Sequence, residues 1–514
     1  MSEATFVVYL VLLGVLAVYG LHRLWFVFRF RAWTSASAAA QSDAADATAA
    51  ADAPYVTVQL PIYNERTVAA RLIRSAARLD HPRERFEIQV LDDSTDETRA
   101  IVDREVAALV AQGIDAKVLR RDDRTGFKAG ALAAGLASAR GELVAIFDAD
   151  FVPEPDFLRR LLPCFADPRV AMAQARWGHE NRCDGMFTRA QATLLDGHFA
   201  LEHRVRHTQG LYFNFNGTAG LWRKSAIADA GGWQHDTLTE DLDLSYRAQL
   251  AGWRFDYRPE VVAPAELPPD ILAFKSQQHR WAKGSVQVAR KLLVEIWRAP
   301  VPLRNKLEAT AHLTGNIGYP LVLALVLCVP LALPAIEALP WWAHAAMFCA
   351  STLSVAVFYA VGQRAVGRTV LERVLDVPSA IALGIGMSVA QTLAVFEGWF
   401  GGTGTFVRTP KRGNARGGRG YRSMLKGLPG IELVVAAWVA FALWRATGER
   451  LWGTLPFLAL FFWGFAWVGV LSLREVLRVQ LSRLRAAPAE FAAAAERAAA
   501  SELTPEPRTD AAAS

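Results

Sequence analysis

The sequence predicts an α/β domain with a mainly parallel mixed sheet, joined to an α-helical transmembrane domain. Between residues 55 and 300, short apolar strands alternate with helical segments, which is typical of βαβ units. Before and after this region, apolar runs long enough to cross a bilayer are bounded by Lys and Arg. The strands are predicted at residues 56–60, 87–91, 117–119 and 143–147.

The composition excludes a single soluble domain. Hydrophobic residues make up 52% of the 514 residues, with 16 Trp and 27 Phe, enough for a large core and several membrane segments. The net charge of +6 could indicate nucleic-acid binding, but the basic residues gather at the ends of apolar runs. We therefore expect a lipid bilayer, and no nucleic acid, among the partners. The four cysteines show no metal-ligand spacing, and no disulfide framework is expected.

The order of the segments predicts an integral, multi-pass protein of a bacterial inner membrane or its equivalent. Residues 1–32 form an anchor with its N-terminus outside, because an acidic start precedes the apolar run and arginines follow it. Residues 33–54, rich in Ala, Ser and Asp, predict a disordered linker. The α/β domain at residues 55–300 is then cytoplasmic. Residues 301–485 form the transmembrane region, and residues 486–514 a disordered tail.

The charge distribution constrains how the C-terminal apolar runs are placed. These runs lie at residues 313–336, 341–361, 379–400, 431–444 and 455–473. If all of them crossed the membrane, the basic stretch 408–426 would face outside, against the positive-inside rule. We therefore predict five spanning helices in total. Residues 379–400 become an interfacial or re-entrant helix, and the loop 401–428 returns to the cytoplasm.

Acidic side chains follow two of the predicted strands. Asp92 and Asp93 follow the second strand, and Asp148 and Asp150 follow the fourth. Ligands of parallel sheets bind beyond the carboxyl ends of the strands, so these groups should gather at one edge. Asp148 and Asp150 point the same way if the extended conformation persists, and could then hold Mg²⁺ or Mn²⁺. Such an ion would neutralise the charge of a departing nucleotide diphosphate.

Further residues could complete a sugar-transfer site, although each also has a structural interpretation. Lys128 stands between glycines at a predicted helix start and could bind phosphate, or could be a solvated lysine. Asp241 could be a general base for an attacking hydroxyl, or only a cap or dipole partner for the following helix. Arg280 could bind diphosphate and Trp281 could stack on a sugar, or both could anchor a helix at the membrane interface.

Four motifs in this order resemble those of the inverting, processive family-2 glycosyltransferases with a GT-A fold, which include the cellulose, chitin and hyaluronan synthases. They are Asp92-Asp93-Ser94, Asp148-Ala149-Asp150, Thr239-Glu240-Asp241 and Gln277-x-x-Arg280-Trp281. Within that superfamily, residues 56–291 are most similar to the cellulose-synthase-like A group, the plant mannan and glucomannan synthases. The membrane region is similar only loosely.

The resemblance implies roles for individual residues. Asp241 would be the catalytic base, and Asp148 and Asp150 the metal ligands. The nucleotide sugar would be bound by Asp92, Asp93, Asp148 and Arg280. Lys128, at its predicted helix start, is a further candidate for binding it. The acceptor would be bound by Phe215, Asn216, Gly217, Thr218, Gln277 and Trp281, although cellulose synthases differ in sequence at residues 215–218. Residues 405–411 resemble their gating loop, with Arg408, Thr409 and Lys411 as gating residues; a basic juxtamembrane loop is the alternative.

The resemblance implies a hexosyltransferase that polymerises a β-linked, β-1,4 polysaccharide such as mannan, glucomannan or glucan and moves it across the membrane. GDP-mannose and UDP-glucose are both candidate donors, and the likeness to mannan synthases favours GDP-mannose. The partners would be the polysaccharide acceptor and, as further candidates, accessory export subunits. One alternative is a non-processive enzyme that adds a sugar to a membrane lipid, as ceramide glucosyltransferases do. The other alternative, a non-catalytic transporter or scaffold, would not need Asp148, Asp150 and Asp241 together.

Overall fold

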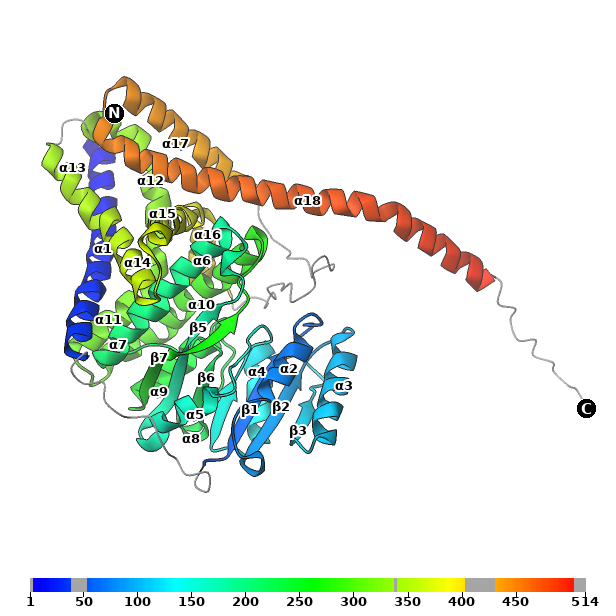
Figure 1. The fold of residues 1–514 in the computed structure, drawn as a ribbon. Coiled ribbons are helices and arrows are strands. Elements are labelled where there is room, and N and C mark those ends of the chain that lie inside the picture. Colours follow the sequence, from blue (N-terminus) through cyan, green and yellow to red (C-terminus); the bar gives the residue numbers. More distant parts are fainter. Residues whose placement is uncertain (1–2, 38–52, 337–339, 403–429, 503–514) are drawn as a thin grey trace, which may run out of the picture.

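The α/β part of the computed structural model is built on one seven-stranded sheet (Figure 1). The structure describes residues 3–37, 53–336, 340–402 and 430–502. The strand order is β3-β2-β1-β4-β6-β5-β7, and β6 runs antiparallel to both of its neighbours. The strands are β1 (Val56–Ile62), β2 (Phe86–Asp92), β3 (Ala116–Leu119), β4 (Leu143–Ile146), β5 (Val170–His179), β6 (Gly220–Arg223) and β7 (Arg254–Ala265). The predicted mixed, mainly parallel sheet is confirmed.

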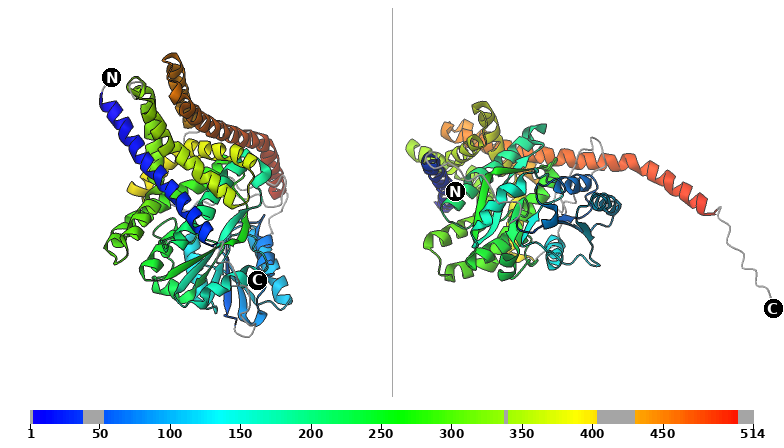
Figure 2. Two further views of the ribbon diagram at one scale, coloured as in Figure 1. Left: turned by 60° about the vertical axis from the view of Figure 1, so that its left-hand side comes forward. Right: turned by 60° about the horizontal axis from the view of Figure 1, so that its bottom comes forward.

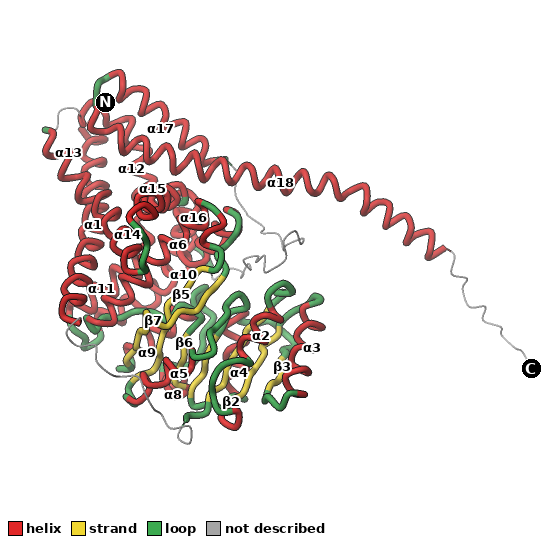
Figure 3. Tube along the Cα trace, viewed as in Figure 1, coloured by secondary structure: helices red, strands yellow, loops and turns green. Residues whose placement is uncertain are grey.

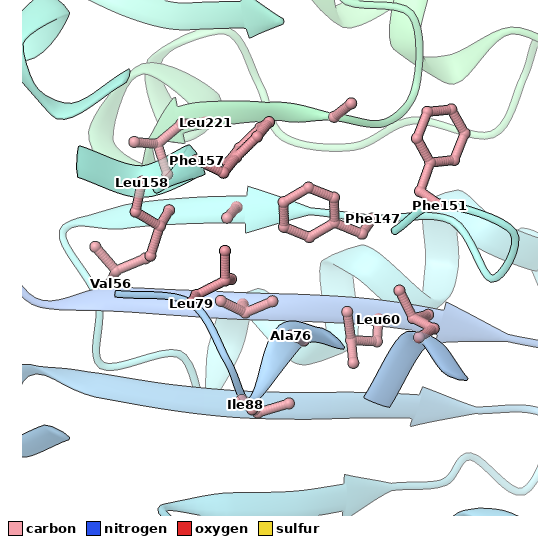
Figure 4. Packing of buried hydrophobic residues seen from close by; sticks show 14 of the residues in the cluster. Val56, Leu60, Ala76, Leu79, Ile88, Phe147, Phe151, Phe157, Leu158 and Leu221 are labelled. Atoms are coloured by element: carbon pink, nitrogen blue, oxygen red, sulfur yellow. The ribbon is translucent and has the colours of Figure 1, made fainter. Parts of the chain in front are cut away.

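Helices cover both faces of this sheet. One face carries α2 (Ala69–Ala76), α3 (Thr98–Ala111) and α5 (Phe157–Leu161). Figure 4 shows apolar side chains packed between α2, α5 and the strands. The other face carries α4 (Phe127–Ala137), α8 (Lys224–Asp229) and α9 (Glu240–Leu250). Since both faces are buried, the edge where the parallel strands end is the part of the sheet left for ligands.

A layer of helices joins the sheet to the apolar helices. α6 (Met186–Asp196) continues through a π-helical segment, Gly197–His203, into α7 (Arg204–Thr208). After β7, α10 (Ile271–Arg298) and α11 (Leu303–Thr314) run towards the apolar helices. Figure 3 shows that the strands are confined to the α/β part and that the remainder is helical.

The apolar helices gather beyond one side of the α/β part (Figures 1 and 2). They are α1 (Glu3–Ser37), α12 (Gly318–Ile336), α13 (Trp341–Phe348), α14 (Ser354–Ala365), α15 (Val370–Gly386), α16 (Ser388–Phe400), α17 (Ile431–Gly448) and α18 (Leu455–Glu502). Among the described residues, four segments are long and apolar enough to span a membrane: Ala4–Ala32, Leu303–Leu333, Ile431–Gly448 and Trp452–Leu481. These helices support the prediction of a membrane protein.

Several predicted boundaries differ from the structure. The predicted span 341–361 is helical, but a π-helical segment, Cys349–Leu353, divides it, and it is not among the four candidate spans. The predicted interfacial helix 379–400 begins inside α15 and continues into α16 after a 49° bend, and the two together could be a broken span or a re-entrant loop.

The two regions predicted to be disordered are partly helical. α1 continues to Ser37, into the predicted linker, and α18 continues to Glu502, into the predicted tail (Figure 1). The tail residues are mostly Ala and Glu, which have high helix propensity and can extend a helix without packing. The gating-like residues Arg408, Thr409 and Lys411 lie outside the described residues, so their role stays a prediction.

α10 packs closely against the start of α9 on one side and against α16 on the other. A Cβ atom on Gly284 of α10 would lie 2.5 Å from Cγ2 of Thr239, the residue before α9. A Cβ atom on Gly398 of α16 would lie 2.8 Å from Cβ of Val286 on α10. A larger residue at either glycine would have to displace a neighbouring helix. These two contacts fix α10 against the α/β part on one side and against an apolar helix on the other.

Candidate active site

A pocket of about 210 Å³ opens at the edge where the parallel strands end. It is lined by the segments that follow β1 and β4, by the end of β5, and by α4, α9 and α10. Many of the predicted site residues meet here: Asp93, Lys128, Asp148, Asp150, Asn216, Gly217, Asp241, Gln277, Arg280 and Trp281. The sequence motifs therefore converge in space, although they are spread over nearly 190 residues.

Of the predicted site residues that the structure describes, three do not line this pocket. Asp92 is 1% exposed and accepts hydrogen bonds from Arg120 (Nη2 to Oδ2, 2.8 Å) and from the backbone N–H of Ser94. Phe215 is fully buried against Trp222. Thr218 is also fully buried, and its Oγ1 accepts a hydrogen bond of 2.8 Å from the backbone N–H of Asp148. In this structure the three residues lie behind the pocket lining, and their contacts with donor or acceptor stay predictions.

Basic and aromatic side chains that the sequence analysis did not single out flank Asp93. Arg121 forms an ion pair with Asp93, and the guanidinium of Arg124 lies 3.2 Å from the ring centroid of Tyr63. Both arginines follow β3, whose end lies beside that of β2 in the sheet. The sequence signal for this cluster was the basic run directly after the third predicted strand.

Lys128 is a buried, paired cation rather than a solvated lysine. Its Nζ lies 2.5 Å from Oδ1 of Asp148 and donates a hydrogen bond of 2.8 Å to the carbonyl of Gly217. Burial by itself would lower the pKa of Lys128, but the carboxylates of Asp148 and Glu240 outweigh this effect and raise it. Lys128 therefore keeps its charge in the pocket, where it could meet a phosphate group.

Two carboxyl groups at the start of α9 complete the charged lining. Thr239, not Asp241, is the N-cap residue of α9, so capping does not account for Asp241. Burial, as the larger cause, and the negative charge of the neighbouring Glu240 together raise the pKa of Asp241 to about 7. Burial also raises the pKa of Glu240 itself. A carboxylate that titrates near neutrality is suited to accept and release a proton.

Arg280 and Trp281 of α10 face the pocket together with residues of β5. Burial lowers the pKa of Arg280 to about 10, although Glu240 opposes the shift, so Arg280 remains cationic. The ring centroid of Trp281 lies 6.2 Å from that of Trp177, which in turn lies 5.3 Å from that of Phe151. An aromatic surface thus adjoins a cation at one end of the pocket. A role only as anchors of α10 at the membrane interface does not explain why Arg280 and Trp281 both line the pocket.

Asp148 and Asp150, the two carboxylates predicted to hold a divalent cation, both line the pocket. β4 ends at Ile146 and Asp150 lies in a turn, so the extended geometry expected from the sequence does not persist. Within the described ranges, no three His, Cys, Asp or Glu side chains group as a metal site. Mg²⁺ commonly binds through one or two carboxylates plus the phosphates of a substrate. The pair fits a cation that binds together with a nucleotide diphosphate.

The mixed sheet, with carboxylates and paired cations at its C-terminal edge, has the arrangement that the sequence predicted for a GT-A domain. Residues 53–284 match the family model described as Glycosyltransferase like family 2, so this segment is a family-2 glycosyltransferase domain. The predicted resemblance is confirmed.

Curated relatives refine this assignment. The chain is 46% identical over 250 residues to glucomannan 4-beta-mannosyltransferase 2 of Arabidopsis thaliana, which covers 48% of this chain and 47% of the relative. It is 44% identical over 276 residues to probable glucomannan 4-beta-mannosyltransferase 9 of Oryza sativa subsp. japonica, covering 52% of each. The chain thus matches about half the length of these relatives.

A solved structure supports the fold. The mannosyltransferase PcManGT from Pyrobaculum calidifontis, in complex with GDP-Man and Mn²⁺, superimposes with a TM-score of 0.50 at 20% identity. The similarity covers 77% of this chain and 99% of the other. The predicted GT-A fold is confirmed.

We expect Gly217→Ala to lower transfer activity by about tenfold or more, because it combines backbone strain with crowding of the pocket. Gly217 has φ +81°, and its Cβ would lie 3.0 Å from Oδ2 of Asp241 and 3.4 Å from Nζ of Lys128. Gly113 is a matched control, since it has φ +74° but nothing within 4 Å of its Cβ. Initial rates should fall only for Gly217→Ala; equal rates in both variants would contradict the prediction.

Proposed function

We propose that this chain is an inverting membrane glycosyltransferase that extends a β-1,4-linked polysaccharide from a nucleotide sugar on the cytoplasmic side of a bacterial inner membrane or its equivalent. The observation that carries the proposal is the meeting of Asp241 with Lys128, Asp148 and Arg280 in one pocket. This arrangement provides a proton acceptor beside cations suited to a diphosphate leaving group.

In this mechanism, Asp241 takes the proton of the acceptor hydroxyl. The hydroxyl oxygen of the acceptor attacks the anomeric carbon of the donor on the side opposite the diphosphate. A single displacement inverts the configuration, so an α-linked donor gives a β-linked product. Lys128 and Arg280 stabilise the negative charge of the departing diphosphate. A divalent cation held by Asp148 and Asp150 would supply Lewis-acid stabilisation of that charge.

GDP-mannose is the donor that the comparisons favour. The relatives are named glucomannan 4-beta-mannosyltransferases, and the similar solved structure holds GDP-Man and Mn²⁺. Asp93, which is paired with Arg121, lies at the end of the pocket suited to the nucleoside. Gln277 and Trp281 lie on α10, at the end suited to the acceptor.

A second cavity supports processive synthesis with export of the product. It measures about 460 Å³ and lies among α1, α12, α14, α15 and α18. Tyr9, Tyr19, Tyr319 and Tyr359 are among its lining residues. Aromatic rings with polar tips suit a carbohydrate that moves past them, because they offer both apolar area and hydrogen bonds. Accessory export subunits would act beyond this cavity.

The proposed function is tested with purified protein in nanodiscs, supplied with Mn²⁺ or Mg²⁺ and with radiolabelled GDP-mannose or UDP-glucose in separate reactions. A long product that mannanase digests would support the proposed polymerase. A cellulase-sensitive product would identify glucose as the sugar, and a single sugar on extracted lipid would favour the lipid-glycosyltransferase alternative. Absence of transfer from both donors would contradict the proposal.

The titration of Asp241 predicts an acidic limb in the pH profile. Burial and Glu240 raise its pKa to about 7, so the carboxyl group is protonated below that pH and cannot accept the proton of the acceptor. We expect kcat/KM to fall as the pH drops below about 7 and to level off above it. The profile is measured with buffers of constant ionic strength, and a flat profile through neutrality would contradict the assigned base.

A further inference from the structure

A buried His–Asp pair lies at one side of the pocket and is not part of the mechanism above. Nε2 of His179 lies 3.1 Å from Oδ1 of Asp196, and the two side chains are 5% and 2% exposed. His179 is the last residue of β5 and lines the pocket, whereas Asp196 is the last residue of α6. A buried pair that ends at a ligand pocket is a candidate for recognition.

The pair fixes which nitrogen of His179 carries a proton. Burial acts to raise the pKa of Asp196, but hydrogen bonding with His179 and Gln363 outweighs it and holds the pKa low. The ionised carboxylate only accepts hydrogen bonds, so Nε2 of His179 is the protonated nitrogen. In a neutral ring, Nδ1 then presents a lone pair. Nδ1 has no hydrogen-bond partner in the described part of the chain. It is not fully buried, so a ligand in the pocket can reach it.

An apolar helix holds this arrangement from behind. Nε2 of Gln363 on α14 donates a hydrogen bond of 2.8 Å to Oδ2 of Asp196, so each carboxylate oxygen has its own donor. Oε1 of Gln363 accepts from Arg182, which also pairs with Asp376 on α15 at 2.6 Å. The orientation of His179 therefore depends on side chains supplied by α14 and α15.

Trp177 adds a surface on the same side of β5. Residues two apart on a strand point to the same face, so Trp177 and His179 stand side by side. The ring of Trp177 adjoins that of Trp281, so an aromatic surface continues from α10 to the end of β5. A sugar ring can stack on such an aromatic surface while one of its hydroxyls donates to the unpaired acceptor Nδ1 of His179.

The position of this surface favours the acceptor over the nucleoside. β1, β4 and β6 separate β5 from β2, which ends beside Asp93. The surface also adjoins Gln277 and Trp281 in the pocket lining. We propose that His179, with Trp177, forms an acceptor subsite in which Nδ1 of His179 accepts a hydrogen bond from one defined hydroxyl of the terminal acceptor sugar. This inference rests on the proposed function, because it names a residue that recognises the acceptor of that reaction.

The test uses the full chain in nanodiscs with saturating GDP-mannose, a β-1,4-linked mannose disaccharide as acceptor, and the set of its monodeoxy analogues. One analogue should have a KM about tenfold higher than the parent disaccharide in the unmodified protein, because it lacks the recognised hydroxyl. His179→Leu should raise the KM of the parent to the same value and abolish the difference between the two. The KM for GDP-mannose should not change.

A matched control and a second measurement separate recognition from misfolding. Arg169 directly precedes β5, is 67% exposed and pairs with Asp167 at 3.1 Å; Arg169→Met should leave acceptor discrimination unchanged. Quenching of tryptophan fluorescence by the disaccharide and its analogues measures binding for any variant that does not turn over. If His179→Leu still discriminates among the analogues as the unmodified protein does, the inference is overturned. If the unmodified protein transfers to no acceptor and binds none, the proposed function fails as well.

Asp196 is a positioning residue in this proposal. An Asn at this position offers one acceptor oxygen to two donors, so either His179 or Gln363 loses its partner. Asp196→Asn should raise the acceptor KM by a smaller factor than His179→Leu, with the KM for GDP-mannose unchanged. Equal changes in both KM values would indicate general damage to the pocket and contradict this role.

Discussion

Asp241→Asn will reduce sugar transfer by a factor of about a hundred or more while nucleotide-sugar binding is retained. The amide has the size of the carboxylate but cannot accept a proton at neutral pH. Donor binding should persist, because Lys128, Asp148 and Arg280 remain in the pocket. The two effects are separated by measuring product formation and, independently, by titrating the protein with GDP-mannose.

Asp236 provides the control for this substitution. It is a carboxylate close in sequence, 54% exposed, and it pairs with Lys291 at 2.8 Å outside the pocket lining. Asp236→Asn should leave both transfer and binding unchanged. If Asp241→Asn were as active as this control, the proton would have to be taken elsewhere, and Glu240 would become the candidate base.

Arg206→Met will destabilise the fold by about 3–5 kcal/mol, the usual result of removing one partner from a buried ion-pair network. Arg206 is 3% exposed, and its Nε lies 3.0 Å from Oε1 of Glu308 while its Nη1 lies 3.4 Å from Oε2 of Glu202. The same carboxylates pair with His22 and Arg23 of α1. The network therefore joins α1, α7 and α11, and its loss should lower the temperature of thermal unfolding in detergent.

Arg169→Met is the surface counterpart of this variant. Arg169 is 67% exposed and pairs with Asp167 at 3.1 Å. Exposed ion pairs contribute at most about 1 kcal/mol, so the unfolding temperature should hardly change. Equal unfolding temperatures for the two variants would show that the buried network does not contribute the predicted stability.

The sequence predicted the strands whose neighbours are close in the chain. β1 to β4 are short, apolar and separated by helices, and their positions follow from that pattern. β6 has four residues and lies between β4 and β5 in the opposite direction, so only long-range pairing defines it. β7 contains exposed charged residues and two prolines, which weaken the strand signal. The sheet order therefore required the structure.

The residue types of the candidate site were predictable from the sequence, but the directions in which their side chains point were not. Asp92 and Asp93 are adjacent, and neighbouring side chains at a strand end point to opposite sides. Arg120 pairs with the buried Asp92, and Arg121 pairs with Asp93 at the pocket. Sequence alone could not assign which aspartate faces the ligand. His179 was missed for a different reason, since its significance depends on contacts with two segments remote in the chain.

The close contacts of α10 limit how this enzyme could be redesigned. Gly284 sets the distance from α10 to the segment that carries Asp241, and Gly398 sets its distance to α16. An engineer who wished to admit a larger sugar by moving α10 outwards would have to shift an apolar helix at the same time. Room for a new substrate is more readily made on the opposite wall, where the pocket is bounded by the segments after β1 and β4 rather than by packed helices.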